Sequence, residues 1–241
     1  MAPKPLRVAV VEDEALLREL LHAVCESKFG CKVIAAVGDG REAVDAILHG
    51  LPDIVLLDLR LPQLDGFGVI TAVRSRGFFP RILILSAVCD SYTAFMVDAA
   101  GVHGFLYKSA TMLPALYRAI LAVSRGERFF CPVFQSFRAA RLNDPLFFGK
   151  ILSAREQTVL AMFSDRMTDP EIAGVLGVSP RTVESHRMNI LRKLGFRSKI
   201  ELERYARNYG FTHSWTAGGA GFPASRRGGG NAPPEGLTSR M

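Results

Sequence analysis

The first half of the chain alternates short apolar runs with longer segments whose apolar side chains recur every three or four residues. Runs rich in β-branched residues favour buried parallel strands, and we expect such strands at 7–11, 32–37, 53–58, 81–86 and 104–107. Helical spacing predicts helices at about 14–28, 65–76, 91–100 and 111–125, with another after Gly40. Five repeats of strand and helix predict an α/β fold, a doubly wound five-stranded parallel sheet.

The second half carries the signals of four short helices. Ser153 and Glu156 form a capping box at the start of the first. We expect Asp169 to cap a second helix over 170–176, and Ser179 to cap a third over 180–194. A fourth is expected over 199–209. Two short helices joined by a Gly-containing turn, the second longer and basic, predict a helix-turn-helix in a small all-α domain.

These patterns divide the chain at three places, into 1–125, 126–150, 151–211 and 212–241. The segment 126–150 holds six Phe and two Pro residues, which is too apolar for a simple flexible linker. We expect this linker either to pack against one domain or to carry a dimer contact. The last segment has 7 Gly and 3 Pro in 30 residues, a composition that predicts a disordered tail.

The composition places the chain among globular proteins with a basic second half. Of 241 residues, 49% are hydrophobic and 22% are charged, which excludes a wholly disordered chain, a collagen and a disulfide-built miniprotein. The net charge of +7 is uneven, because residues 1–123 carry −1 whereas 151–211 carry +3. This asymmetry favours an anionic partner for the second half.

The cysteines and the apolar runs exclude several further classes. Cys25, Cys31, Cys89 and Cys131 form no CxxC pair, so we expect small buried thiols rather than a zinc site or disulfides. The longest fully apolar stretches span four to six residues, whereas a membrane helix needs about 20. Acidic residues follow the N-terminus too soon for a signal peptide. The expected location is the cytoplasm.

Polar side chains stand where the predicted strands end. Glu12 and Asp13 follow the first strand, Asp58 ends the third, Ser86 ends the fourth and Lys108 follows the fifth. In a parallel sheet these ends share one edge, so the side chains are expected to converge there. Clustered carboxylates repel one another and favour a hard cation such as Mg²⁺. Asp58 can then attack a phosphoryl group, whose oxygens Ser86 and Lys108 can contact.

The motifs VEDE, DIVLLDLRLPQLDGF, ILSA and GFLYKSA, in this order over about residues 5–125, resemble the signatures of a bacterial response-regulator receiver domain with a flavodoxin-like fold. The resemblance implies that a sensor histidine kinase phosphorylates Asp58. It implies Mg²⁺ ligands from Glu12, Asp13, Asp58 and the backbone carbonyl of Arg60. It also implies that Ser86, Phe105 and Lys108 are switch residues, although a plain core role for Phe105 is equally open.

The predicted helix over 180–194 has an outer face that suits the major groove of DNA. Glu184 on this face can accept from a cytosine amino group, and Met188 can meet a thymine methyl group. The cations on and beside the face can contact phosphates. The expected DNA-binding residues are Arg181, Thr182, Glu184, Ser185, Arg187, Met188, Arg192 and Lys193.

The stretch from LSAREQTVLAMF to ELERYA, within about residues 150–211, resembles a LuxR-type four-helix DNA-binding domain. The family pattern implies that the helix over 180–194 reads DNA and that the helix over 199–209 supports dimerisation. Family members often carry Lys or Arg where this chain has Glu184 and Met188, so the target site stays open. A solvated helix surface or a protein-binding unit is the alternative.

Together the two resemblances imply a response regulator of the NarL/FixJ type, which forms a homodimer when phosphorylated, binds double-stranded DNA and is not an enzyme. A regulator that binds DNA without phosphorylation is one alternative. An aspartate-nucleophile phosphatase is another, but such hydrolases need a second carboxylate two residues after the nucleophile. This chain has Arg60 at that position.

Overall fold

The computed structural model describes residues 4–109 and 112–211, and within them a parallel sheet forms the centre of the N-terminal lobe. The sheet order is β2-β1-β3-β4-β5-β6, and every neighbouring pair is parallel. The strands are β1 (Arg7–Val11), β2 (Lys32–Val37), β3 (Ile54–Asp58), β4 (Arg81–Ser86), β5 (Gly104–Tyr107) and β6 (Phe129–Phe130). The first five strands therefore lie where the apolar runs predict them.

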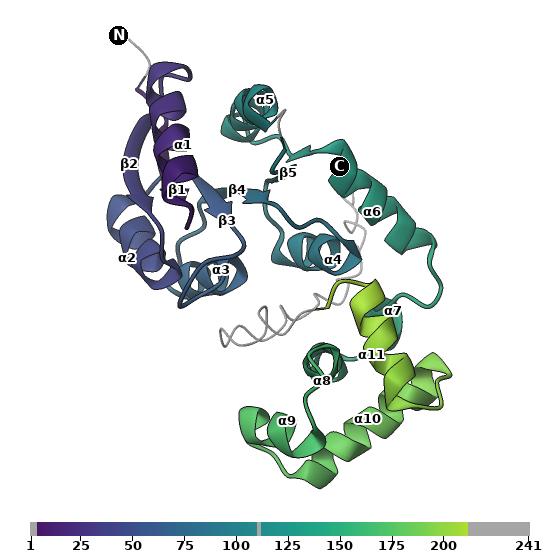
Figure 1. The fold of residues 1–241 in the computed structure, drawn as a ribbon. Helices are drawn as coiled ribbons and strands as arrows, with labels where there is room; N and C mark the ends of the chain where they lie inside the picture. The colour runs from purple at the N-terminus through teal and green to yellow at the C-terminus, as the bar shows by residue number, and fades with distance from the viewer. Residues whose placement is uncertain (1–3, 110–111, 212–241) are drawn as a thin grey trace, which may run out of the picture.

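Helices cover both faces of this sheet, as right-handed crossovers between parallel strands require. On one face lie α1 (Ala15–Ser27) and α5 (Met112–Ser124). On the other lie α2 (Gly40–Gly50), α3 (Gly66–Ser75) and α4 (Ser91–Ala100), as Figure 1 shows. Because both faces are covered, β1, β3 and β4 are almost entirely buried and read as continuous apolar runs.

The predicted number of five strands is wrong by one. β6 pairs with β5 through Gly104 with Phe129 and Phe105 with Phe130. Two residues are too few to show a strand period, so the apolar pattern alone does not reveal this element. Gly104 allows the close pairing, since an added Cβ would lie 2.6 Å from the carbonyl oxygen of Phe129.

The predicted linker is largely structured. After β6 it forms α6 (Pro132–Asn143) and α7 (Phe148–Ile151). Pro132 begins α6, a position where its missing N–H costs nothing. Figure 1 shows α6 beside α4, and Phe134 of α6 is fully buried. Of the two expected roles for this segment, packing against a domain is the one that the structure shows.

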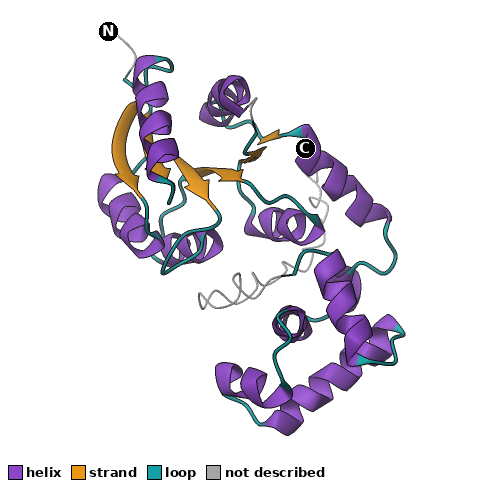
Figure 2. Ribbon diagram, in the orientation of Figure 1, coloured by secondary structure: helices purple, strands orange, loops and turns teal. Residues whose placement is uncertain are grey.

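The C-terminal lobe consists of helices throughout its described residues, as Figure 2 shows. They are α8 (Ala154–Ser164), α9 (Asp169–Leu176), α10 (Pro180–Leu194) and α11 (Lys199–Asn208). The capping box of Ser153 with Glu156 and the cap at Ser179 are confirmed. The expected cap at Asp169 is wrong, because Thr168 caps α9 and forms a capping box with Glu171. Thr168 lies one residue before Asp169, and its hydroxyl accepts the backbone N–H of Glu171.

Two further expectations concern the chain as a whole. Cys25, Cys31 and Cys131 are buried, which agrees with the expected burial, and Cys89 is partly buried. Across the described residues, the helices are all too short or too polar to cross a membrane. The predicted tail at 212–241 lies outside the described residues.

Candidate functional site

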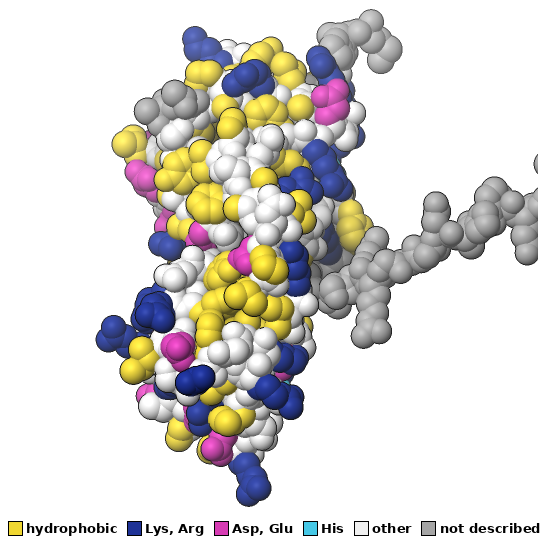
Figure 3. Space-filling view, turned by 90° about the vertical axis from the view of Figure 1, so that its right-hand side faces the viewer, with side chains coloured by type: hydrophobic (Ala, Val, Ile, Leu, Met, Phe, Trp, Pro, Cys, Tyr) yellow, Lys and Arg dark blue, Asp and Glu magenta, His cyan; other side chains and the backbone are white. Residues whose placement is uncertain are grey.

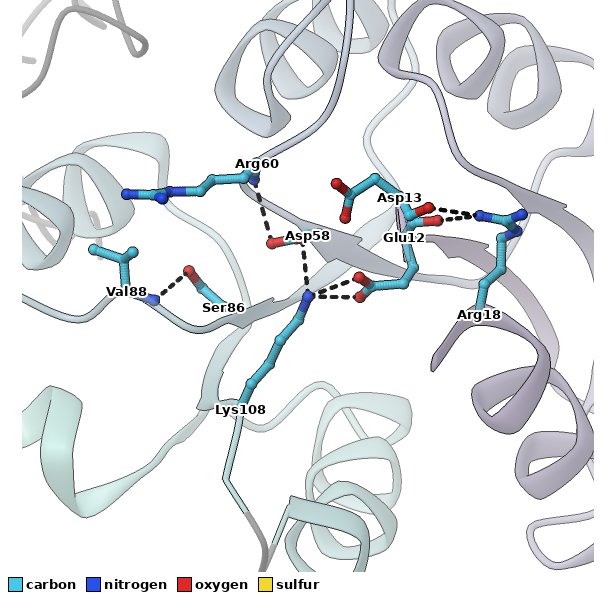
Figure 4. A network of polar contacts seen from close by, with 8 residues as sticks. All are labelled: Glu12, Asp13, Arg18, Asp58, Arg60, Ser86, Val88 and Lys108. Atoms are coloured by element: carbon cyan, nitrogen blue, oxygen red, sulfur yellow. Dashed lines mark hydrogen bonds and ion pairs between the residues drawn. The ribbon is translucent and has the colours of Figure 1, made fainter. Parts of the chain in front are cut away.

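The carboxyl ends of β1 and β3 bring three acidic side chains together at one edge of the sheet. Figure 4 shows the tip of Lys108 at the carboxylates of Glu12 and Asp58, with Asp13 beside Glu12 and its carboxylate pointing away from Lys108. One carboxylate oxygen from each acid lies within 4.8 Å of the others. Glu12 and Asp58 are buried, whereas Asp13 is exposed to solvent. A single divalent cation can therefore contact all three and can enter from the side of Asp13, so the residues fit such an ion.

Lys108 stands between the two buried acids. Its Nζ lies 2.7 Å from Glu12 Oε2 and 2.8 Å from Asp58 Oδ2. Burial acts to lower the pKa of Lys108, but the hydrogen bonds and negative charges of Asp58 and Glu12 outweigh it and raise the pKa. For the Glu12 carboxyl, burial acts in the other direction and raises the pKa, and the hydrogen bond from Lys108 opposes that rise. Lys108 therefore stays charged and balances the acids.

Backbone groups at the ends of β3 and β4 complete the surroundings of Asp58. The N–H of Arg60 donates to Asp58 Oδ1 at 3.2 Å, which puts the Arg60 backbone beside the pocket. The Ser86 hydroxyl accepts the N–H of Val88 at 3.1 Å. Gly66 at the start of α3 lets the chain pack closely against the end of β3, because an added Cβ would lie 2.5 Å from the Asp58 carbonyl oxygen.

Arg18 is a residue of this site that sequence reasoning missed. Its Nη1 donates to the carbonyl of Glu12 at 2.7 Å and to that of Asp13 at 3.2 Å, so it holds the backbone that carries both acids (Figure 4). Gly38 leaves the space for this guanidinium, because an added Cβ would lie 2.7 Å from Nη1. The only sequence signal is a cation five residues after Asp13.

The predicted switch aromatic, Phe105, is fully buried. Its ring lies 5.0 Å from that of Phe134 in α6, and Phe134 stacks in turn on Phe130 at 4.8 Å. The linker therefore covers Phe105. A movement of the Phe105 ring toward α6 meets the ring of Phe134.

The predicted DNA-reading helix, α10, presents most of its expected face to solvent. Arg181, Thr182, Glu184, Ser185, Met188 and Arg192 are exposed, while Val183, Ile190, Leu191 and Leu194 are buried. Thr182 also serves the helix start, where its Oγ1 lies 2.8 Å from Ser179 Oγ.

Two of the expected DNA contacts are instead engaged within the fold. Arg187 Nη2 lies 3.1 Å from Asp169 Oδ2 of α9, and the Arg187 side chain is 23% exposed. Lys193 Nζ lies 2.7 Å from Glu156 Oε2, a carboxylate that is 6% exposed. Each of these cations is therefore paired with an acid, and Lys193 differs from Arg187 in that its own side chain is 36% exposed.

The two lobes meet through aromatic side chains. The ring of Tyr92 in α4 lies 5.9 Å from that of Phe148 and 4.5 Å from that of Phe211, and the ring of Phe95 lies 5.1 Å from that of Phe148. Arg141 of α6 joins Asp98 of α4 at 2.5 Å. Figure 3 views the side of α6 and α11 and shows apolar side chains gathered between the lobes. We name the cluster of Tyr92, Phe95, Phe148 and Phe211 the aromatic seam. It joins the sheet lobe to the segment that follows α11.

Comparison with protein families agrees with both halves of this geometry. Residues 8–119 match the response regulator receiver domain, and residues 150–206 match the luxR family of bacterial regulatory proteins. The receiver match contains Glu12, Asp13, Asp58, Ser86 and Lys108. The second match contains α8, α9, α10 and most of α11.

Relatives and solved structures extend the match over most of the chain. The chain is 32% identical over 201 residues to the nitrate/nitrite response regulator protein NarP of Escherichia coli, covering 81% of this chain and 92% of NarP. It is 31% identical over 214 residues to the oxygen regulatory protein NreC of Staphylococcus aureus, covering 83% and 96%. A LuxR-family response regulator from an Aurantimonas species matches 58% of this chain and all of its own, at 30% identity and a TM-score of 0.54.

The RcsB response regulator of Salmonella typhimurium matches in fold, with a TM-score of 0.56 at 20% identity over 85% of this chain and 99% of RcsB. The family matches, the relatives and the acidic pocket all point the same way. The chain belongs to the two-component response regulators, phosphorylation-controlled transcription regulators that join a receiver domain to a LuxR-type DNA-binding domain.

Proposed function

We propose that Asp58 accepts the phosphoryl group and that Glu12, Asp13 and Asp58 hold Mg²⁺ together with the backbone carbonyl of Arg60. The observation that carries this proposal is the position of Lys108, whose ammonium lies between Glu12 and Asp58 where the three carboxylates meet. Mg²⁺ bound there supplies positive charge that offsets the charge of the phosphoryl oxygens. No second buried acid stands at position 60 to activate water, which argues against a phosphatase.

The transfer itself needs little from the chain beyond Asp58. One Asp58 oxygen bonds to phosphorus as the bond from phosphorus to the imidazole nitrogen of the kinase breaks, and the imidazole keeps the electron pair. Lys108 is already 2.8 Å from Asp58, so its ammonium is in place to pair with the added negative charge. The Ser86 hydroxyl can move to donate to a phosphoryl oxygen. Because the same hydroxyl accepts the N–H of Val88, this movement pulls on the backbone of Val88.

The path from this pocket to the second lobe starts in the loop that contains Val88. The same loop leads to Asp90, the N-cap of α4, and then to Tyr92 in the aromatic seam. Phe105 offers a second path through Phe134 of α6. We infer that phosphorylation shifts an equilibrium between a closed seam and an open one, which frees the DNA-binding domain to pair with a second copy.

For DNA binding, we propose that α10 enters the major groove with Arg181, Thr182, Glu184, Ser185, Met188 and Arg192 toward the duplex. A dimer reads two half-sites about one helical turn apart. The ion pairs of Arg187 and Lys193 give these two residues a structural role, so their sequence-based assignment to DNA is the weaker part of the set. We further propose domain boundaries at 125, 150 and 211 and a cytoplasmic location.

Phosphorylation and DNA selection test the proposal together. The full chain, Asp58→Asn and the control Asp53→Asn, which lies at the opposite end of β3, are treated with a small phosphodonor and Mg²⁺ and offered random-sequence duplexes. We expect wild type and the control to gain one phosphoryl group by intact mass and to enrich a paired site, and Asp58→Asn to do neither. Equal enrichment by Asp58→Asn supports phosphorylation-independent binding, and sustained release of phosphate supports the phosphatase.

A further inference from the structure

We propose that Glu184 sets the sequence preference of this protein by selecting cytosine in the base pair that it faces. The inference rests on the proposed entry of α10 into the major groove and names the DNA feature that this helix reads. Two observations carry it: the exposure of Glu184 in the middle of the α10 face, and the tethering of the nearest guanidinium away from that face.

Arg187 is the nearest cation to Glu184, but it is committed to α9. Its Nε and Nη2 lie 3.2 and 3.1 Å from Asp169 Oδ2, and its side chain is 23% exposed. The Glu184 side chain is 60% exposed and reaches Arg187 Nη2 only at 3.8 Å. The Glu184 carboxylate is thus weakly paired and can meet a base, whereas two nitrogens of Arg187 are held on a single Asp169 oxygen.

The charges on the helix are therefore arranged as an acidic centre between two basic ends. Arg181 in the first turn and Arg192 in the last turn are both exposed. Such cations bind phosphates and hold the helix in the groove, without reading sequence. Between them the exposed side chains are those of Thr182, Glu184, Ser185 and Met188. The Ser185 hydroxyl donates to the Arg181 carbonyl at 2.9 Å.

An acceptor-only carboxylate discriminates between bases by what they present in the major groove. Guanine presents O6 and N7 and thymine presents O4, which are acceptors that repel a carboxylate. Adenine presents an amino group beside the N7 acceptor, whereas cytosine presents its N4 amino group alone. A carboxylate brought to DNA without a donor loses its water and gains nothing in return. Cytosine is therefore the base that best compensates the Glu184 carboxylate for its lost hydration.

Met188 lies one helical turn beyond Glu184 on the same side and is 55% exposed. An unbranched thioether has no donor to offer and gains most from an apolar partner. The thymine C5 methyl group is the apolar feature of the major groove. We therefore expect thymine next to the cytosine in each half-site.

The test compares selected sites among variants of the full, phosphorylated chain. Wild type, Glu184→Gln and Glu184→Lys are each selected against random-sequence duplexes. Wild type is expected to enrich cytosine at one position of each half-site, Glu184→Gln to move that position toward adenine, and Glu184→Lys to move it toward guanine. Glu127→Lys is the control, because it makes the same charge change at an exposed position next to β6. It is expected to leave every base preference unchanged.

Titration of single duplexes gives the size of the effect. Replacing the selected cytosine is expected to weaken wild-type binding by about 5- to 150-fold, and to weaken Glu184→Ala binding far less. If wild type enriches a site and all variants enrich the same one, the assignment of Glu184 is wrong while DNA binding by α10 stands. If wild type enriches no sequence, both are wrong.

Discussion

The backbone N–H of Tyr92, in the first turn of α4, donates at 2.9 Å to the carbonyl of Tyr209, the C-cap residue of α11. Residues 117 positions apart in the sequence are thereby joined at the aromatic seam. Tyr92 is 1% exposed and its ring lies 4.5 Å from that of Phe211. The receiver domain therefore holds the DNA-binding domain by the end of its last helix, while the outer face of α10 stays open to solvent.

Gly210 tests whether this contact holds the lobes together. It has φ +83, and an added Cβ would lie 2.2 Å from the Asp90 carboxylate. We expect Gly210→Ala to separate the lobes, which small-angle scattering of the full chain measures as a larger radius of gyration. Gly177→Ala is the control, because Gly177 has φ +63 with nothing near its missing Cβ. Each substitution costs about 1–2 kcal/mol of backbone strain, so only a difference between them reports on the seam.

An unchanged radius of gyration in Gly210→Ala would mean that the seam closes around the added methyl group. In that case the contact is not what keeps the domains together. Stronger DNA binding by unphosphorylated Gly210→Ala than by the unphosphorylated wild type would identify the seam as the inhibited state.

The sheet and the acidic pocket are predictable from the sequence because their signals are local. Buried parallel strands require uninterrupted apolar runs, and the residues that follow those runs must lie at one sheet edge. Asp58 and Lys108 are 50 positions apart, yet the strand register alone brings them together. The same holds for α10, because Ser179 directly before the helix and Gly195 directly after it are local signals for its start and its end.

The remaining features depend on contacts that no local pattern encodes. The pairing of Arg187 with Asp169 depends on how α10 packs against α9. From the sequence alone, a basic residue on this helix cannot be told apart from a DNA contact. The two-residue β6 forms because β5 offers an open edge and Phe134 covers Phe105. Arg18 acts through backbone carbonyls, which leave no trace in side-chain spacing.

Removal of the Lys108 charge should make the acidic pocket depend on Mg²⁺. Lys108→Met leaves Glu12 and Asp58 buried without a counter-ion. We therefore expect the free energy of unfolding, measured in EDTA, to fall by about 3–5 kcal/mol. Mg²⁺ restores the balance of charge, so the rise in Tm on adding millimolar Mg²⁺ is expected to exceed that of wild type. Thermal unfolding in both buffers measures this, with the exposed Lys32→Met as control. Equal Mg²⁺ shifts in wild type and Lys108→Met would contradict a cation site beside Lys108.

Adjacent cations on α10 should behave differently toward DNA. Arg192 is exposed, so Arg192→Ala is expected to lower affinity for every sequence and to reduce the salt slope by about 0.9 per subunit. Lys193 is paired with Glu156, so Lys193→Ala is expected to keep the slope and to destabilise the domain by about 1 kcal/mol. Binding titrations over a range of salt, together with urea unfolding, separate the two effects. A reduced slope in Lys193→Ala would show that its ion pair opens on DNA.

Asp65 should give the receiver domain a stability that falls as the pH rises. It caps α3 by accepting the Gly68 N–H at 2.7 Å, and burial raises the pKa of its carboxyl from 3.8 to about 6. Between these values the folded state holds a proton that the unfolded state has lost. Stability is therefore expected to decline from about pH 4 to about pH 6, by up to about 3 kcal/mol at 1.4 kcal/mol per pKa unit, and then to level off.

Asp65→Asn isolates this contribution, because the amide keeps a capping oxygen but cannot ionise. Urea unfolding from about pH 4 to about pH 7 should show a gap between variant and wild type that widens in favour of the variant as the pH rises through this window. Asp39→Asn makes the same change at the less buried cap of α2, where the carboxylate accepts from Arg41 and Glu42, and serves as the matched control. Parallel curves for wild type and Asp65→Asn would mean that the buried cap is solvated well enough to ionise at its ordinary pH.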